Sequence, residues 1–215
     1  MVRLSLLLQE NTNTISAKIR KQILKDINTT MDKVSIRVIG PIRNLVRQAI
    51  LDQPEALSLS GGTLAGEFGL PDGRNRIEDI VNQWVSNIIV SKKRATASGR
   101  LFNASFTIKM IRADYKDVLQ SVSASVVTDK GSQLDWLEWL LLFGDRTIVR
   151  GYDVSFQSNR RSRSGIAIMV GGIGKNWGVP PEFSGTINNN FVTRAIDGIE
   201  DDIIKIFEKQ LRLLT

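Results

Sequence analysis

The chain of 215 residues contains no cysteine and no histidine. Without cysteine, the sequence excludes a disulfide framework, a thiolate metal site and a cysteine nucleophile. Without histidine, it lacks the commonest general base and metal ligand, so Ser-His-Asp and Cys-His catalysis and ordinary zinc sites are excluded. A Mg²⁺ or Ca²⁺ site held by carboxylates alone stays open. We therefore expect a protein that is not an enzyme and has no cofactor and no resident metal.

The sequence also lacks a hydrophobic run long enough to cross a membrane. Its start, MVRLSLLLQEN, contains an apolar run far shorter than the roughly 20 residues that a transmembrane helix requires. The same stretch has no small-residue cleavage site of the kind that ends a signal peptide. We expect a protein that has no membrane partner and is soluble and cytoplasmic when it is made.

Positive charge is in excess, with 29 lysines and arginines against 22 acidic residues and a net charge of +7. Such a surplus is typical of proteins whose partner is rich in negative charge, although it can also serve solubility alone. The length and the 42% hydrophobic content suit one continuous domain. Within it we expect a helical N-terminal region with a glycine-rich loop (1–98) and a sheet-plus-helix core (99–215).

Helical periodicity dominates the N-terminal region. Isoleucines recur every four residues over 15–27, and an apolar stripe resumes after Gly40-Pro41 and continues to Pro54. This pattern predicts two helices, or one kinked helix, over 14–53. The alternation over 34–38 could instead form a strand.

A second amphipathic helix is predicted over 76–89, and a glycine-rich stretch precedes it. Residues 58–73 contain five glycines, which predict a surface loop. The cations that follow the second helix suit the negative end of its dipole, so residues 91–99 are interpreted as a helix end followed by a flexible turn.

Strand-like alternation begins after residue 100. Residues 101–111 and 118–128 alternate and predict half-buried strands. Residues 135–143 predict a short apolar helix that Gly144 ends. Residues 147–156, with a bulge at a central glycine, are expected to pair with 166–170 as a hairpin.

The last 45 residues are expected to form a loop and a terminal helix. Glycine and proline punctuate residues 171–190, which predicts a loop, and an apolar stripe over 189–214 predicts one final amphipathic helix. The resulting fold class is α+β, with an antiparallel sheet flanked by a long N-terminal helix and a C-terminal amphipathic helix.

Clusters of cations are the candidate DNA-facing or partner-binding residues. They are Lys92, Lys93, Arg94 and Arg100, then Arg160, Arg161 and Arg163 at the expected hairpin tip, and Lys175. An exposed arginine tip can bind phosphate or carboxylate groups, and we expect that replacing its three arginines with serine leaves the fold intact. The motif around Lys175 lacks the spacing of a phosphate-binding loop. Trp177, Pro180 and Pro181 indicate a stiff, partly buried loop that packs on the sheet.

The C-terminal half resembles the tail-completion, or neck, proteins of tailed bacteriophages, in the HK97 gp10-like and minor tail protein Z-like families. The resemblance rests on Leu137-Glu138 followed by Gly144, on Gly185-Thr186, and on the aromatic-Arg-Ala element over 191–195 that opens the last helix. The runs SRSGIAIMV and WGVPPEFSGT are also similar to phage structural proteins. The resemblance covers mainly residues 100–215.

This resemblance implies a structural virion protein of the head-tail connector that forms a homo-oligomeric ring, usually six-fold. The implied partners are a portal-adaptor or head-closure protein, a tail terminator or tube protein, and the double-stranded DNA that passes through the ring. The implied location is the virion neck, after assembly in the host cytoplasm. Cations in the lumen would then moderate phosphate repulsion without reading sequence. The alternative is a nucleic-acid-binding or DNA-processing protein, which the charge clusters alone would also suit.

Overall fold

The computed structural model describes residues 11–99, 101–110, 115–128, 130–157 and 161–214. The architecture mixes helices with antiparallel strand pairs, and it includes the predicted long N-terminal helix and C-terminal helices. The elements, in chain order, are α1 (Thr12–Leu51), α2 (Pro54–Leu59), α3 (Thr63–Glu67), α4 (Gly73–Ser86), β1 (Ile89–Ser98), β2 (Leu101–Lys109), α5 (Lys116–Leu119), the 3₁₀ turn η1 (Val122–Ala124), β3 (Val126–Val127), β4 (Gln133–Leu134), α6 (Trp136–Leu142), β5 (Thr147–Ser155), β6 (Ile168–Gly178), η2 (Pro181–Phe183), α7 (Phe191–Asp197) and α8 (Glu200–Arg212).

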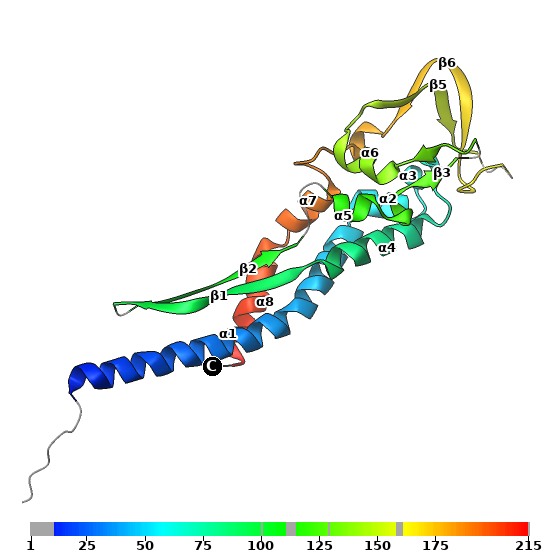
Figure 1. Ribbon diagram of the computed structural model, residues 1–215. Helices are drawn as coiled ribbons and strands as arrows, with labels where there is room; N and C mark the ends of the chain where they lie inside the picture. Colours follow the sequence, from blue (N-terminus) through cyan, green and yellow to red (C-terminus); the bar gives the residue numbers. More distant parts are fainter. Residues whose placement is uncertain (1–10, 100, 111–114, 129, 158–160, 215) are drawn as a thin grey trace, which may run out of the picture.

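The molecule is elongated, and its two ends differ (Figure 1). At one end, the first turns of α1 and the β1–β2 hairpin project beyond the other elements. At the other end, α2 to α6 gather around the C-terminal part of α1, and the β5–β6 pair arches over them. We call these the extended end and the compact end.

The helix α1 continues through Gly40-Pro41, so the 34–38 segment is helical and not a strand. Proline inside a helix leaves the carbonyl four residues earlier without its partner. Here both Pro41 and Arg37 are exposed, so water can bind that carbonyl. The neighbours on the inner side, Val38 and Ile42, are fully buried and hold the helix against the core.

One hydrophobic cluster holds the compact end together and includes residues from both sides of position 98. Phe68 lies at its centre, with its ring centroid 6.2 Å from that of Trp136 and 6.0 Å from that of Trp177. Trp84 and Phe191 make a second edge-to-face pair at 6.1 Å. Such aromatic pairs add about 0.5–1.5 kcal/mol each to the burial of their area.

The strands form three separate antiparallel pairs, β1–β2, β3–β4 and β5–β6, among the described residues. In β5–β6 the register breaks between Arg150 and Tyr152, which pair with Asn176 and Gly171. Gly151, at φ +77°, adopts the left-handed conformation that the predicted bulge requires. Residues 172–175 of β6 therefore have no partner in the ladder and form the top of the arch.

Three expectations about loops are wrong. Residues 58–73 contain the end of α2 and all of α3, because buried Leu64, Phe68 and Leu70 bring this stretch into the core. Residues 91–98 belong to β1 and not to a turn, because they pair with β2. Residues 171–178 continue β6 and are not loop.

The expected strand over 118–128 and the single final helix are also wrong. Only Val126–Val127 is strand, because tertiary polar contacts shape the rest: Arg76 donates to the carbonyls of Val122 and Ser125, and Trp136 to that of Ser123. The C-terminal helix divides at Gly198, a poor helix former. The three acidic residues of the first turn of α8 stabilise the new N-terminus through the helix dipole.

Candidate assembly surfaces

The first cationic cluster joins β1 to α1. Lys92 forms an ion pair with Asp32 of α1. The ladder with β2 is interrupted after Lys93, and the free N–H of Ala95 donates instead to the Asn28 side-chain oxygen of α1 at 2.9 Å. The bulge therefore fixes where the hairpin crosses the helix, and Lys92 has a structural partner.

Between these two contacts, β1 presents its other cations to solvent. Lys93 and Arg94 are exposed, while Arg100 lies outside the described residues. The hairpin also exposes apolar side chains, with Leu101 at 70% exposure. Lys93 and Arg94 thus remain available for a partner, as the sequence suggested.

In the second cluster, Arg163 is not part of the exposed tip that we expected. The side chain of Arg163 is half-buried, and its guanidinium donates to the carbonyl of Val127 at 2.7 Å. It lies against Gly69, where an added Cβ would be 2.9 Å from a guanidinium nitrogen. Arg163 therefore anchors the β5–β6 connection to the compact end. Arg161 is exposed, and Arg160 lies outside the described residues.

The arch of β6 carries Lys175 and the most exposed large hydrophobic residue described, Ile173. Lys175 forms an ion pair of 3.3 Å with Asp153 on the paired strand, and both side chains are more than half exposed. Exposed pairs of this kind contribute about 0–1 kcal/mol to stability. The arch is a polar ridge with one apolar side chain at its top.

Trp177 lies at the end of β6 and not in a loop. It is 5% exposed, and its indole N–H donates to Glu67 of α3 at 2.7 Å. Burial raises the pKa of the Glu67 carboxyl, the Trp177 hydrogen bond opposes this, and Asp153 and Glu182 raise it further. Pro180 and Pro181 follow, with Pro180 half-buried and Pro181 exposed at the start of η2.

The two cationic clusters lie at opposite ends of the molecule (Figure 1). Lys93 and Arg94 belong to the β1–β2 hairpin at the extended end, whereas Arg161 and Lys175 belong to the β5–β6 region at the compact end. They therefore do not form one patch on a single chain.

The residues quoted for the phage resemblance do come together. The N–H of Gly144, just after α6, donates to the carbonyl of Gly185 at 2.9 Å. A Cβ on Gly185 would lie 2.6 Å from the Leu140 carbonyl, so only glycine fits there. The two parts of the motif thus form one close backbone contact between α6 and the segment before α7.

Asn190, fully buried, begins α7. Its side-chain oxygen accepts from the N–H groups of Val192 and Thr193 at 3.1 Å each, and Thr193 completes a capping box. Its amide nitrogen donates to the Tyr115 hydroxyl and the Thr186 carbonyl, both at 2.9 Å. Burial raises the pKa of that hydroxyl. This network fixes the angle at which the C-terminal helices leave the compact end.

A second contact holds α7 to α2. Arg194 forms an ion pair with Glu55, which is 2% exposed. A buried carboxylate that loses its partner is costly, so this pair constrains the position of α7.

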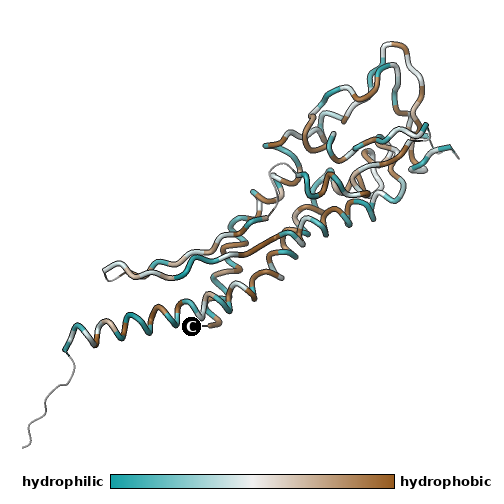
Figure 2. Tube along the Cα trace, viewed as in Figure 1, coloured by the Kyte–Doolittle hydropathy of each residue, from teal (hydrophilic) through white to brown (hydrophobic). Residues whose placement is uncertain are grey.

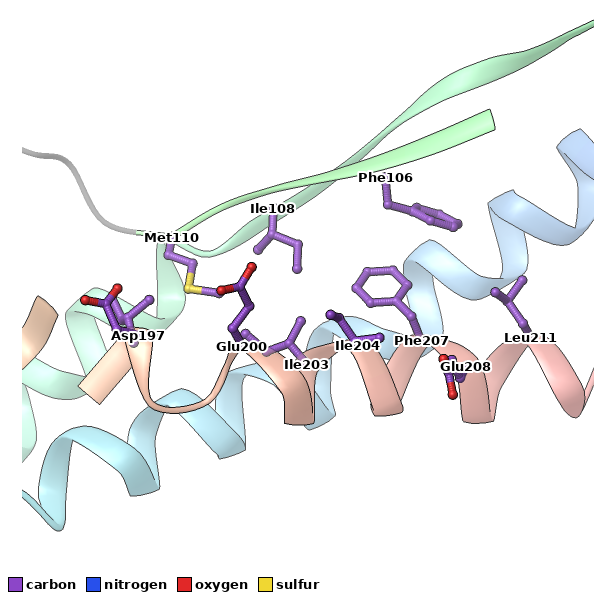
Figure 3. A pocket seen from close by; sticks show the side chains of 11 residues that line it. Phe106, Ile108, Met110, Asp197, Glu200, Ile203, Ile204, Phe207, Glu208 and Leu211 are labelled. Carbon is purple, nitrogen blue, oxygen red and sulfur yellow. The ribbon is translucent and has the colours of Figure 1, made fainter. Parts of the chain in front are cut away.

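A groove between β2 and α8 is the clearest unfilled surface (Figure 3). It has a volume of about 600 Å³ and is lined mainly by apolar side chains, with carboxylates from Asp197, Glu200 and Glu208. Phe106 and Phe207 meet across it with their ring centroids 4.9 Å apart. The periodicity of both elements predicts their apolar faces, but nothing in the sequence indicates that a groove remains between them.

The described part of the chain offers no cluster of three or more carboxylates that could hold a metal ion. Within the same residues, no helix combines the length and hydropathy needed to span a bilayer. Comparison of the chain with protein-family models, with curated proteins and with solved structures finds no match.

Proposed function

We propose that this chain is a structural protein of a tailed-phage neck, which assembles into a ring between the head-closure complex and the tail and lets DNA pass. The observation that carries the proposal is the elongated protomer (Figure 1), which exposes apolar side chains such as Ile19 and Leu101 at its extended end and has an apolar groove between β2 and α8. Apolar surface that a chain leaves exposed is typical of interaction sites.

The exposed area supports an assembling protein. The chain exposes 14032 Å² for a mass of 24.0 kDa, whereas a compact monomer of this mass exposes about 9,900 Å². Even after subtracting the roughly 160 Å² that each residue of an unfolded chain exposes, for every residue outside the described part, about 10,800 Å² remains. Burial in contacts between subunits would remove this excess.

The placement of charge supports a role around DNA. The net charge is +7, and the described cations Lys93, Arg94 and Arg161 are exposed. In a ring, such side chains from every subunit would face the lumen and lower the cost of passing phosphate through it. The contact between Gly144 and Gly185 supports the resemblance, because it joins two motif segments that are separated in the sequence.

The test is the presence of the chain in phage particles. We expect mass spectrometry of purified virions to find it at a fixed ring stoichiometry, and labelled particles to show it at the neck. Deleting its gene should leave filled heads and free tails that do not join. Its absence from virions, together with normal particles from the deletion, would contradict the proposal.

A second candidate is a DNA-binding or DNA-processing protein, which the exposed Lys93 and Arg94 on the hairpin favour. Purified protein separates the two functions. A neck subunit should bind duplex DNA weakly, without sequence preference and with strong salt dependence. Cleavage of DNA that requires Mg²⁺ and stops with EDTA would favour the second candidate.

A further inference from the structure

The first turns of α1 carry an apolar stripe that no other described element covers. Ile15 is 36% exposed and Ile19 is 54% exposed, while the same stripe is buried from Met31 onward. Figure 2 shows the hydrophobic residues recurring along α1 well beyond the part that packs against the rest of the chain. Helices with an amphipathic face gain most of their stability in proteins from burying that face.

The groove between β2 and α8 has the complementary chemistry. Its walls include Ile108, Ile204 and Leu211, and its carboxylates come from the end of α7 and from α8 (Figure 3). The stretch of α1 over 12–27 is mostly exposed, with Ile23, Leu24 and Ile27 half-buried, and it carries four cations and one acid. A basic amphipathic helix therefore matches an apolar groove with acidic side chains, which is the helix-in-groove mode of recognition.

The geometry excludes the chain's own α1 as the occupant. The first turns of α1 project away from the rest of the molecule, whereas α8, which lines the groove together with the end of β2, lies further along it (Figure 1). We propose that residues 12–27 of α1 in one copy dock in the β2–α8 groove of the next copy. This inference rests on the proposed ring, and it names the contact between the subunits.

This contact joins two different surfaces, so it is head-to-tail. Each copy offers one helix and one groove, and such an interface generates a closed ring or an open filament according to the rotation between neighbours. Isoleucines spaced by four residues are about 6 Å apart along a helix, so Ile15, Ile19 and Ile23 can enter a groove that α8 lines from Glu200 to Leu211, about three helical turns.

The absence of cysteine makes the contact testable by cross-linking. Ile19→Cys and Ile204→Cys are prepared separately, each is shown to assemble as the unchanged chain does, and the two are mixed with a short bis-maleimide reagent. We expect a cross-linked dimer in the mixture and only background in either variant alone. Ile36→Cys, which places a thiol at a site that is 75% exposed on the same helix, is the matched control and should not cross-link to Ile204→Cys.

A second measurement uses the affinity between copies. The double variant Ile15→Ser, Ile19→Ser should weaken self-association roughly tenfold or more, because it removes the apolar anchors of the interface. Ile36→Ser should leave it unchanged, and circular dichroism should show all three proteins folded. Analytical ultracentrifugation over a range of concentrations measures the effect.

The outcomes separate this contact from the neck function. Oligomers that form without a cross-link in the mixture would overturn the docking and leave the ring intact. A cross-link formed within one molecule of the Ile19→Cys, Ile204→Cys double variant would show that α1 folds back on its own groove, which also overturns it. A chain that stays monomeric at every concentration and is absent from virions would overturn the docking and the neck function together.

Discussion

The helix α1 passes through two environments, and its isoleucines show the difference between the ends of the molecule. In the compact end Ile42 and Ile50 are fully buried, whereas in the extended end Ile19 is 54% exposed. The residue type and the helical spacing are the same. An apolar stripe in the sequence therefore shows which face of a helix can be buried, but not whether the same chain or another copy buries that face.

Shortening an isoleucine at each end of α1 tests this difference in burial. Ile42→Ala should lower the free energy of unfolding by about 2–5 kcal/mol, since it leaves a cavity in a packed core. Ile19→Ala should change it by no more than about 0.5 kcal/mol, since its site in the monomer is open. Urea denaturation at a protein concentration low enough to prevent assembly measures both. Equal losses would show that the extended end is packed within one chain.

The hydrogen-bond network of Asn190 at the start of α7 gives the next largest expected loss of stability. Asn190→Ala removes the cap of α7 and leaves the Tyr115 hydroxyl without its amide donor, so we expect a loss of about 2 kcal/mol. Tyr115→Phe removes the hydroxyl and keeps the cap, so it should cost about 1 kcal/mol. Thermal unfolding of both variants separates the contribution of the α7 cap from that of the hydrogen bond to the Tyr115 hydroxyl. A larger loss from Tyr115→Phe than from Asn190→Ala would contradict the capping role.

The long periodic elements could be predicted from the sequence, because their apolar residues repeat over several turns or pleats. α1, α4, α6 and β5 with its glycine bulge agree with the pattern, whereas only the first residues of β6 do. Prediction failed where glycine suggested a loop. In residues 58–73 the glycines instead allow close packing, and a Cβ on Gly73 would lie 2.1 Å from the Leu59 carbonyl.

The candidate surfaces were harder to predict, because they depend on contacts between distant segments. Nothing local to Arg163 indicates that its guanidinium would reach Val127, 36 residues earlier. The groove could not be predicted without knowing that the apolar faces of β2 and α8 lie opposite each other and leave a space between them. The charge clusters could be predicted from the sequence, but their location at opposite ends of the molecule could not.

Arg163 also distinguishes an anchoring cation from a solvent-exposed one. Arg163→Ser should destabilise the fold by about 1 kcal/mol, because it removes the hydrogen bond to the Val127 carbonyl. Lys93→Ser removes one positive charge from an exposed strand position and should stay within about 0.5 kcal/mol. Denaturation curves of the two variants at the same ionic strength make the comparison. If both are neutral, Arg163 belongs with the exposed cations after all.

The smallest expected effect is the pH dependence that Glu67 contributes at the compact end. Its folded pKa is raised above 4.5, mainly by burial, so the folded state binds the proton more tightly than the unfolded chain. The free energy of unfolding should therefore fall as pH rises from 4.5 through the folded pKa, and stay constant above it with respect to this group. Glu67→Gln keeps an acceptor for the Trp177 indole N–H and should lose this decline. Chemical denaturation from pH 4 to pH 8 compares the two proteins, and parallel curves across that range would show that Glu67 titrates as it does in the unfolded chain.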